Sequence, residues 1–420
     1  MTKLLIVADD FTGALDTGVQ FTKQGIRTLV TTNENIDIAN MDPEVSVLVV
    51  DVESRHISPE MAYERVKKIV SKAKMCGITH IYKKTDSALR GNIGSELQAV
   101  MDACGENEMF FIPAFPKIGR TTKLGYHYLD GVPIHESVFG QDPFEPVRHS
   151  FIPDVIGEQS AMQVVLCETG DAGKIKPQAD EKTLYVFDAE SSSDLEENGK
   201  LLKQNGKIKL LAGCAGFAEM LAGLLEIEMK PMEVEIDDLG MIVVSGSVNQ
   251  ITLDQLNYAK ENGFFSHTFE PVQKLDNGFV DSKDGEALFA RIDEVYKKQH
   301  KVVLEAVSGR EDMKVSDDYA EANGYNLETI RTTIADNIGK FVAKLVKNNE
   351  KTTLVVFGGD TLIAIMQHVG CEGIVPLTEI TPGVVMAQAI GKEHQFHIVT
   401  KSGGFGEKDV IKKIEKYLDV

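Results

Sequence analysis

Acidic and basic side chains follow three apolar runs in the first half of the chain, at the points where each run ends. These side chains are Asp9 and Asp10 after residues 4–8, Arg55 after residues 45–50, and Lys84, Thr85, Asp86, Ser87 and Arg90 after residues 78–82. In open α/β sheets, ligands bind beyond the carboxyl ends of the strands. A cation there would pair with a carboxylate, and the aspartates would accept hydrogen bonds from hydroxyls. The pattern therefore predicts a pocket for a small acid that carries hydroxyl groups.

Two of these carboxylates, Asp9 and Asp86, are candidate catalytic groups. Either could act as a base toward a substrate hydroxyl if it lies within hydrogen-bond reach. In the alternative interpretation, Asp9 and Asp10 only cap the following helix. Lys83 and Lys84 would then be solvated surface charges. The convergence of three such clusters at one sheet edge favours the binding site.

Small residues and glycines follow the apolar runs in the second half of the chain. They are residues 245–247, 308–309, 358–361 and 401–406. Glycines between a strand and a helix allow backbone N–H groups to approach phosphate oxygens, and the helix N-terminus favours negative charge. No P-loop pattern and no G-x-G-x-x-G occurs, so neither of those nucleotide signatures is predicted. The set of turns still predicts a nucleotide site, although glycines that only supply positive φ remain the alternative.

The stretch from residue 113 to residue 153 has no clear periodicity and is too long for an ordinary connection, so it predicts a functional loop or a lid. It contains His127, His135 and His149. These histidines could ligate a metal, but they form no i, i+4 pair and have no cysteine nearby, which favours packing or a place near the substrate. The metal ligands stay unknown at this stage.

The elements that position these residues are visible as short apolar runs that alternate with amphipathic stretches. The runs are residues 4–8, 45–50, 78–82, 109–112, 164–166, 184–187 and 210–212, and then 241–244, 302–306, 353–357 and 397–400. Helical patterns between them include residues 59–76, 92–103, 327–346 and 407–418. Such runs predict strands buried on both faces of a parallel sheet. The predicted fold class is α/β with two domains, each a mainly parallel sheet flanked by helices.

A charged, strand-poor stretch near residues 229–239 separates the two series of runs. It contains Lys230, Pro231 and an acidic run at residues 233–238, a polar connector of the kind that joins domains. We therefore expect a first domain at residues 1–230, with the acid pocket, and a second at residues 240–420, with the glycine turns.

The composition limits the partners of the chain. Its 420 residues include 44 Lys and Arg against 64 Asp and Glu, a net charge of −20 that would repel nucleic acid. The five cysteines lie far apart without a C-x-x-C pair, which is typical of reduced thiols in a reducing compartment. No apolar run reaches the length of a membrane span. We expect a cytoplasmic protein that does not bind nucleic acid or membranes.

Six motifs along essentially the whole chain resemble those of the four-carbon acid sugar kinases, which phosphorylate threonate, erythronate or 3-oxo-tetronate with ATP. They are ADDFTGALD at residues 8–16, KKTDSALRGNIG at 83–94, IPAFPKIGRTT at 112–122, VVSGS at 243–247, VFGGDT at 356–361 and TKSGGFG at 400–406. The KKTDS form looks more like the threonate and erythronate branch than the oxo-tetronate branch.

The resemblance implies a role for each domain. The first would hold the sugar acid through Asp9, Arg55 and residues 84–87. The second would hold ATP; the residues implied are Ser245, Gly358, Gly359, Asp360, Thr361, Gly403 and Gly404. The strand-end charges and the glycine turns indicate the same division.

The expected reaction is transfer of the γ-phosphoryl group of ATP to the terminal hydroxyl of D-threonate or D-erythronate, which gives the 4-phosphate. Mg²⁺ on the phosphates would neutralise part of the charge, with Lys84 or Arg90 helping. Two alternatives remain: a 3-oxo-tetronate kinase, and a non-catalytic sugar-acid sensor that binds the same ligand. The expected partner is the small sugar acid, and a homo-oligomer stays open.

Overall fold

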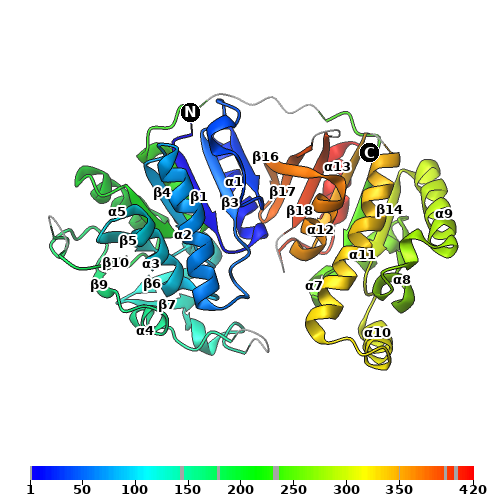
Figure 1. The fold of residues 1–420 in the computed structure, drawn as a ribbon, viewed down its shortest axis with the longest axis horizontal. Helices are drawn as coiled ribbons and strands as arrows, with labels where there is room; N and C mark the ends of the chain where they lie inside the picture. The colour runs from blue at the N-terminus through cyan, green and yellow to red at the C-terminus, as the bar shows by residue number, and fades with distance from the viewer. Residues whose placement is uncertain are drawn as a thin grey trace. The chain divides into compact units, whose positions relative to one another are not determined.

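The computed structural model describes residues 2–141, 146–176, 180–229, 236–349, 351–391, 395–401 and 405–420. The chain forms two compact units, residues 1–232 and 233–420. Each unit has a mainly parallel sheet flanked by helices, so the predicted α/β fold class is confirmed (Figure 1). Of the predicted connector, Lys230, Pro231 and residues 233–235 lie outside the described residues.

The main sheet of the first unit is entirely parallel, in the order β2-β3-β1-β4-β11-β5-β10-β9 among the described strands. Its strands are β1 (Leu4–Ala8), β2 (Thr28–Thr31), β3 (Val47–Asp51), β4 (His80–Lys84), β5 (Glu108–Ile112), β9 (Gln163–Cys167), β10 (Thr183–Phe187) and β11 (Leu210–Gly213). Every residue of β1, β3 and β10 is buried, which explains why these strands are continuous apolar runs. The runs predicted in this half are all strands, and β2 is additional.

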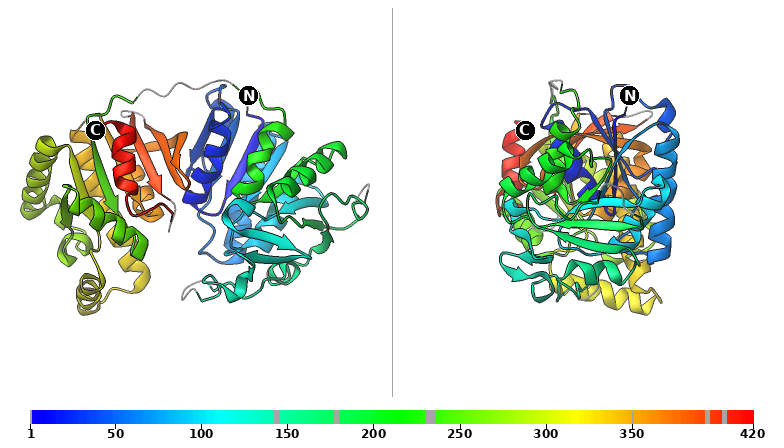
Figure 2. Two further views of the ribbon diagram at one scale, coloured as in Figure 1. Left: turned by 180° about the vertical axis from the view of Figure 1, so that it is seen from behind. Right: turned by 90° about the vertical axis from the view of Figure 1, so that its left-hand side faces the viewer.

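Helices cover both faces of this sheet (Figure 2). They are α1 (Phe11–Thr22), α2 (Pro59–Met75), α3 (Ile93–Cys104), α4 (Ile152–Gly157), α5 (Ser192–Gln204) and α6 (Ala215–Leu224). α1 packs against α6, whereas α2 packs against α3. Helix α2 begins at Pro59 after the N-cap Ser58, and its buried residues form one stripe at helical spacing. The stripe of α2 joins α3 and the sheet in one apolar core.

A small antiparallel sheet occupies part of the stretch that the sequence predicts to be a loop or a lid. It consists of β6 (Arg120–Lys123), β7 (Tyr126–Leu129) and β8 (Val132–Pro133). These strands have only four, four and two residues. Strands this short give no readable periodicity, which is why the sequence shows only an irregular stretch.

The sheet of the second unit is mixed, in the order β13-β14-β12-β15-β18-β17-β16 among the described strands. Its strands are β12 (Gly240–Ser245), β13 (Phe265–Thr268), β14 (Lys301–Glu305), β15 (Thr352–Phe357), β16 (Cys371–Thr381), β17 (Val384–Gly391) and β18 (Gln395–Lys401). The pairs β16–β17 and β17–β18 are antiparallel, and the other pairs of this sheet are parallel. The sequence predicts β12, β14, β15 and β18 but misses β13, β16 and β17.

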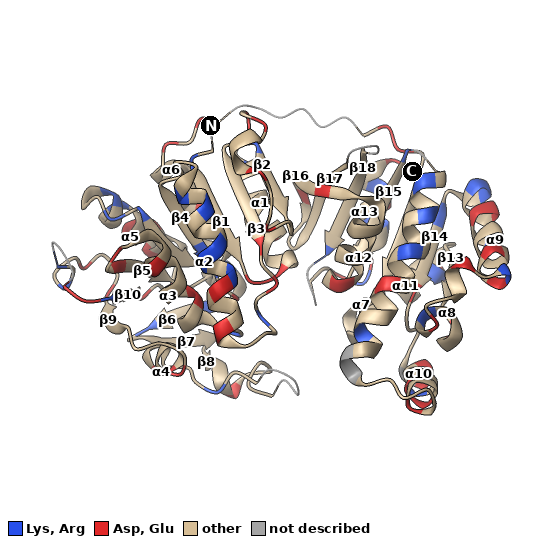
Figure 3. Cartoon of the chain, in the orientation of Figure 1, with Lys and Arg blue, Asp and Glu red and all other residues tan. Residues whose placement is uncertain are grey.

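The helices of the second unit are α7 (Gln250–Glu261), α8 (Pro271–Leu275), α9 (Lys283–Gln299), α10 (Arg310–Ala322), α11 (Leu327–Asn348), α12 (Gly359–Val369) and α13 (Val410–Leu418). α7 packs against α13, and α11 packs against α8 and α12. Both acidic and basic side chains occur along α9, whereas the second half of α11 carries only basic ones (Figure 3). One apolar core joins α7 and α13 to the sheet strands.

The first four strands of each unit are connected in the same order. In the first unit the order is β2-β3-β1-β4, and in the second it is β13-β14-β12-β15. In both, the second strand lies at one edge of the sheet and the third strand lies between it and the first. The fourth strand then pairs with the opposite side of the first. This reversal creates a topological switch point, which is where open α/β sheets bind ligands. The expected ligand positions are therefore beyond β1 and β4, and beyond β12 and β15.

Two further expectations concern the cysteines and membrane spans. All five cysteines are free thiols, as predicted. Within the described residues, no helix combines the length and the apolar character needed to cross a bilayer.

Candidate functional site

The register of the first sheet brings the three charged clusters together. Val7 of β1 lies opposite Lys83 of β4, and Ala8 lies opposite Asp51 of β3. The residues that follow these strands therefore emerge at one level of the same sheet edge. The sequence correctly indicates that these clusters converge, and the switch point between β1 and β4 lies among them.

Arg55 is the centre of the site. Its Nε donates to Asp9 Oδ2 at 2.7 Å, and its Nη2 donates to Asp10 Oδ1 at 2.6 Å. Nη2 also lies 3.6 Å from Asp86 Oδ1. The side chain is only 8% exposed, so these contacts are shielded from water. The guanidinium that the sequence suggests for a substrate carboxylate is thus already paired with two aspartates.

Asp86 is held by its own loop. Arg90 donates to both carboxylate oxygens, from Nε at 2.8 Å and from Nη2 at 3.0 Å, and the backbone N–H of Ala88 adds a bond at 3.1 Å. Burial alone would raise the pKa of Asp86, but Arg55 and Arg90 hold it far below its usual range. A carboxylate with this many donors is stable as an anion and is a poor proton acceptor.

Asp9 is less fully engaged. Oδ2 accepts from Arg55, whereas Oδ1 is buried without a hydrogen-bond partner among the described residues and lies 3.9 Å from Lys84 Nζ. Burial raises the pKa of Asp9, but Arg55 and then Lys84 outweigh it, so the net shift is downward. Asp9 is therefore an anion with one oxygen facing an unfilled hydrogen-bonding position.

Lys83 and Lys84 are buried, so the alternative of solvated lysines is wrong. Lys84 reaches the first turn of α1, where a Cβ on Gly13 would lie 2.5 Å from its Nζ. Lys83 points away from that turn to Glu96, with Nζ and Oε2 2.8 Å apart and both side chains almost completely buried. The capping alternative is correct for Asp10, whose Oδ1 accepts from the Gly13 N–H at 3.3 Å.

Buried polar atoms without hydrogen-bond partners gather at this edge. Within the described residues they include Asp9 Oδ1, Asp51 Oδ2 and Thr85 Oγ1. A buried polar atom that lacks a partner costs about 1–3 kcal/mol, and native proteins rarely tolerate several in one place. These three atoms lie at the ends of, or directly after, the neighbouring strands β1, β3 and β4. They are what a polyhydroxylated ligand would satisfy.

His127 contacts the loop that holds Asp86. Its ring is fully buried, with Nε2 3.0 Å from the Ser87 carbonyl oxygen and Nδ1 3.0 Å from Thr122 Oγ1. The carbonyl can only accept, so Nε2 carries the proton and Nδ1 accepts from the threonine hydroxyl. Burial lowers the pKa of His127 to about 4. Ser87 thus takes part in the site through its backbone carbonyl, which accepts from His127.

Because this pKa falls from 6.5 to about 4, the unfolded chain binds a proton in that interval while the folded chain does not. The free energy of unfolding is therefore highest above pH 6.5, and it decreases as the pH falls toward 4. We expect His127 to reduce the free energy of unfolding by about 2 kcal/mol between pH 7 and pH 5. Urea unfolding of wild type and His127→Gln measures how much of the pH dependence of the free energy of unfolding comes from His127. Identical pH dependence in both proteins would contradict the buried, neutral assignment.

The other two histidines of this stretch, His135 and His149, contact different residues. His135 Nδ1 contacts Ser150 Oγ at 2.7 Å, and His149 Nε2 contacts Glu158 Oε1 at 3.0 Å. In the part of the chain that the structure describes, no three His, Cys, Asp or Glu side chains group as a metal site. Each of the three histidines therefore has its own contacts, and the structure does not bring them together.

A cavity of about 230 Å³ opens beside Arg55 and Arg90. Arg148, His149 and Gln159 complete its wall. The volume lies below the range of about 300–1,000 Å³ that is typical of drug-sized ligands, so the cavity suits a small molecule. Arg148 is an exposed cation at its rim. The sequence does not single out Arg148 or Gln159, and the only signal is their place in or just after the irregular stretch.

The second sheet presents its glycine turns at the equivalent edge. Ser245, Phe357 and Lys401 lie in register at the ends of β12, β15 and β18. A Cβ on Gly246 would lie 2.2 Å from Thr361 Oγ1, so the first turn needs glycine to pack against α12. Gly358 has φ +125°, a conformation that side chains rarely adopt. The predicted residues Ser245 and Gly358 to Thr361 are brought together.

The N-terminus of α12 is open. Its N-cap is Gly358, and no side chain caps the helix. The first N–H groups of a helix carry partial positive charge and bind anions when no side chain caps them. The Asp360 carboxylate in this turn is 47% exposed and faces Arg331 at 3.5 Å. Gly403 and Gly404 lie outside the described residues.

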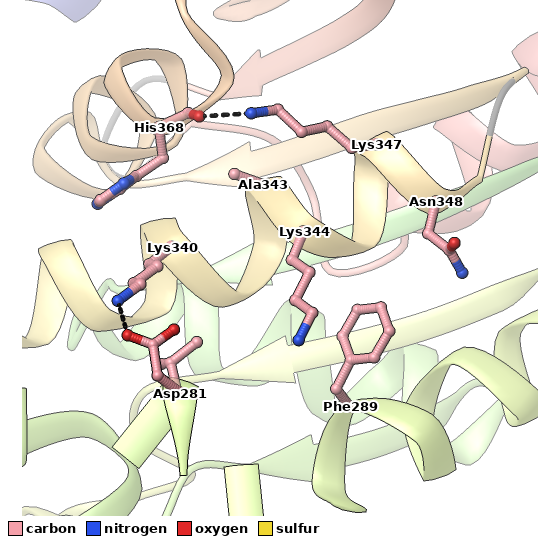
Figure 4. Close-up of a pocket in the computed structure, with 9 residues that line it drawn as sticks. Asp281, Phe289, Lys340, Ala343, Lys344, Lys347, Asn348 and His368 are labelled. Carbon is pink, nitrogen blue, oxygen red and sulfur yellow. Dashed lines mark hydrogen bonds and ion pairs between the residues drawn. The ribbon is translucent and has the colours of Figure 1, made fainter. Parts of the chain in front are cut away.

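Another cavity of the second unit, about 400 Å³, lies along α11 (Figure 4). Its charged groups already have partners, because Lys340 pairs with Asp281, Lys347 Nζ donates to the His368 carbonyl oxygen, and Lys344 lies over the Phe289 ring. His368 is also about 14 Å along α12 from Gly359, at 1.5 Å per residue. This cavity is therefore separate from the glycine turns and is a weaker candidate.

Two family models match the chain. A sugar-binding N-terminal domain matches residues 4–221, and a nucleotide-binding C-terminal domain matches residues 242–411. Together they span more than half of the sequence, and each falls within one structural unit.

Curated relatives match nearly the full length. A D-threonate kinase from Salmonella typhimurium is 28% identical, with 97% of this chain and 96% of the relative covered. A D-erythronate kinase from Heliobacterium modesticaldum is 27% identical (100% and 97%). A 3-oxo-tetronate kinase from Methylobacterium radiotolerans is 28% identical (96% and 96%). The similar identities do not separate the three substrates.

The fold also matches a crystal structure of a protein from Salmonella typhimurium LT2. The TM-score is 0.81 at 21% identity, with 99% of this chain and 100% of that chain covered. At this identity the likeness concerns the fold alone.

Proposed function

The chain belongs to the four-carbon acid sugar kinases, which makes it an ATP-dependent kinase, and we propose that it phosphorylates the terminal hydroxyl of D-threonate or D-erythronate to the 4-phosphate. The first unit binds the sugar acid and the second binds ATP. The partners in this proposal are small molecules.

The observation that carries the proposal is the group of unpartnered polar atoms around Asp9. Asp9 Oδ1 and Thr85 Oγ1 are buried and lack hydrogen-bond partners among the described residues. A small aldonate has several hydroxyls, each of which donates and accepts. Its hydroxyls would satisfy these atoms, and Arg90 with Arg148 would face its carboxylate from the wall of the cavity.

The nucleotide fits the second unit for a different reason. The first backbone N–H groups of α12, which follow β15, have no side-chain cap, and the helix start adds a favourable dipole. The implied ligands are Ser245, Gly358, Gly359, Asp360 and Thr361. Gly403 and Gly404 remain part of the proposal without structural description.

Mg²⁺ would neutralise charge on the transferred phosphoryl group. The donor set fits this ion, because Mg²⁺ prefers oxygen ligands and usually binds one or two carboxylates together with phosphates and water. Asp360 provides a partly exposed carboxylate directly at the open N-terminus of α12. We assign Asp360 as the side chain that would share the ion with the phosphates.

Of the two candidate catalytic aspartates, the geometry favours Asp9. Its buried Oδ1 has no hydrogen-bond partner among the described residues, whereas both oxygens of Asp86 accept from Arg90. Asp9 would orient the attacking hydroxyl and accept its proton as the bond to phosphorus forms. Asp86 acts through Arg55 and Arg90, as a positioning residue.

An ADP-release assay over a panel of four-carbon acids tests the proposed function. We expect turnover with D-threonate or D-erythronate in excess of that with the 3-oxo acid. Preference for the 3-oxo acid would instead assign the chain to that branch. ADP release that no acid of the panel stimulates would refute the proposal and favour a sugar-acid sensor.

A glycine substitution tests the nucleotide half separately. Gly246→Ala places a methyl group against Thr361, and should disturb the turn that faces the phosphates. Loss of one charge-assisted N–H contact costs about 1.5–3 kcal/mol, or about 10- to 100-fold in the Kd for ADP. Isothermal titration measures the effect, with Gly223→Ala as control because a Cβ there meets nothing within 4 Å. Unchanged ADP binding by Gly246→Ala would place the phosphates elsewhere.

A further inference from the structure

Lys401 is a buried cation at the end of β18, within the motif at residues 400–406. Its neighbour across the sheet is Phe357, which in turn lies opposite Ser245. Lys401 is only 4% exposed, although it stands next to the glycine turn that follows β18. Fully buried lysines are rare unless an interaction requires their charge.

The ammonium of Lys401 points toward the first turn of α7. Nζ lies 3.3 Å from Thr252 Oγ1, and the Thr252 hydroxyl is 3.5 Å from Ser247 Oγ. Thr252 is the third residue of α7, so the cation faces a helix N-terminus. The Asn249 side chain caps that end by accepting from the Ile251 N–H at 2.9 Å, so the ammonium lies beside a well-defined helical turn.

Other side chains fix this arrangement in place. The Phe357 ring lies under the ammonium, with Nζ 5.1 Å from the ring centroid. Gln255 Nε2, one turn further along α7, donates to the carbonyls of Phe405 at 3.2 Å and Gly406 at 2.9 Å. The strand end, the α7 N-terminus and the segment after the glycine turn are therefore tied to one another.

From this geometry we propose that Lys401 binds a phosphate oxygen of the nucleotide, and that Thr252 holds its ammonium in position. The inference rests on the proposed function, because it needs the nucleotide at the glycine turns of the second unit. It adds a side-chain cation to a site otherwise built from backbone N–H groups. In phosphoryl transfer such a cation stabilises charge on the phosphate oxygens.

The protonation of Lys401 supports this role. Burial lowers its pKa to about 8. The Thr252 hydroxyl from α7 and the Phe357 ring from β15 lie against its ammonium. A bound phosphate would favour the ammonium form. At pH 8.5, ADP binding should therefore take up a substantial fraction of a proton, which titration in buffers of different ionisation enthalpy detects.

The test compares ADP with adenosine, which lacks the phosphates. Lys401→Met should weaken ADP binding about 10- to 100-fold, leave adenosine binding unchanged and abolish the proton uptake. Lys401→Arg should restore most of the ADP affinity. Lys413→Met is the matched control, because Lys413 is a lysine of α13 paired with Glu407 and Asp409 at the surface. Thermal melting of each variant reports on folding.

Two results would overturn the proposal. Equal ADP affinity in wild type and Lys401→Met would show that the ammonium does not contact phosphate. A parallel loss of ADP and adenosine affinity would show that Lys401 only supports the fold. The proposed function fails in a different way, since wild type would then release no ADP with any acid, whatever Lys401 does.

Discussion

Asp9→Asn should lower kcat for the preferred four-carbon acid by about 1,000-fold, within the range of about 10²–10⁴ that is typical of a lost general base. Asparagine keeps the shape of the side chain and one carbonyl oxygen, so it can still accept from Arg55. What it loses is the charge and the open acceptor Oδ1. The KM for ATP should change little, because we propose that the nucleotide binds to the other unit. Steady-state kinetics with a coupled ADP assay measure both quantities.

Asp37→Asn is the matched control, because Asp37 is an exposed aspartate of the same unit that contacts Asn40. It should retain wild-type kcat. Asp86→Asn should reduce activity partly through the KM for the acid, since Arg90 and Arg55 lose their anchor. Wild-type turnover by Asp9→Asn would remove Asp9 from the mechanism.

Lys83→Met should lower the free energy of unfolding by about 3–5 kcal/mol, the usual cost of removing one partner of a buried ion pair. Lys83 Nζ and Glu96 Oε2 are 2.8 Å apart, and the exposed fractions of the two side chains are 0% and 1%. Burial already raises the pKa of Glu96, and Lys83 opposes that shift. Without the lysine, Glu96 must stay charged without compensation or take up a proton.

The double variant Lys83→Met/Glu96→Gln separates charge from packing. It should recover most of the lost stability, because the uncompensated carboxylate is gone. Lys200→Met serves as the control, since its pair with Glu196 is exposed and should contribute less than about 1 kcal/mol. Urea unfolding of the full chain at pH 7 provides the comparison. Equal losses for Lys83→Met and Lys200→Met would mean that the buried pair does not stabilise the first unit.

The strands at the centre of each sheet could be predicted because burial on both faces requires uninterrupted apolar residues. β1 and β12 are examples, with every residue buried. β16 and β17 were missed because they form an antiparallel hairpin with partly exposed positions. Their polar residues break the apolar run, and their register shifts interrupt any regular alternation.

The candidate site could be predicted as a set of residues but not as a network. Strand ends can be read from the sequence, and register then brings Asp9, Arg55 and Lys84 together. The pairing of Arg55 with Asp9 and Asp10 depends on side-chain direction, which no sequence pattern contains. The sequence likewise does not indicate that Lys401 is buried, because a lysine after a strand usually reaches solvent.

The central claim is that the sugar acid and the triphosphate bind to different units of the chain. A crystal structure with ADP and D-threonate or D-erythronate tests it directly. We expect the β-phosphate within hydrogen-bond distance of the backbone N–H groups of residues 359–361, and an acid hydroxyl on Asp9 Oδ1. Nucleotide phosphates bound against Arg55 and Arg90 instead would contradict the account.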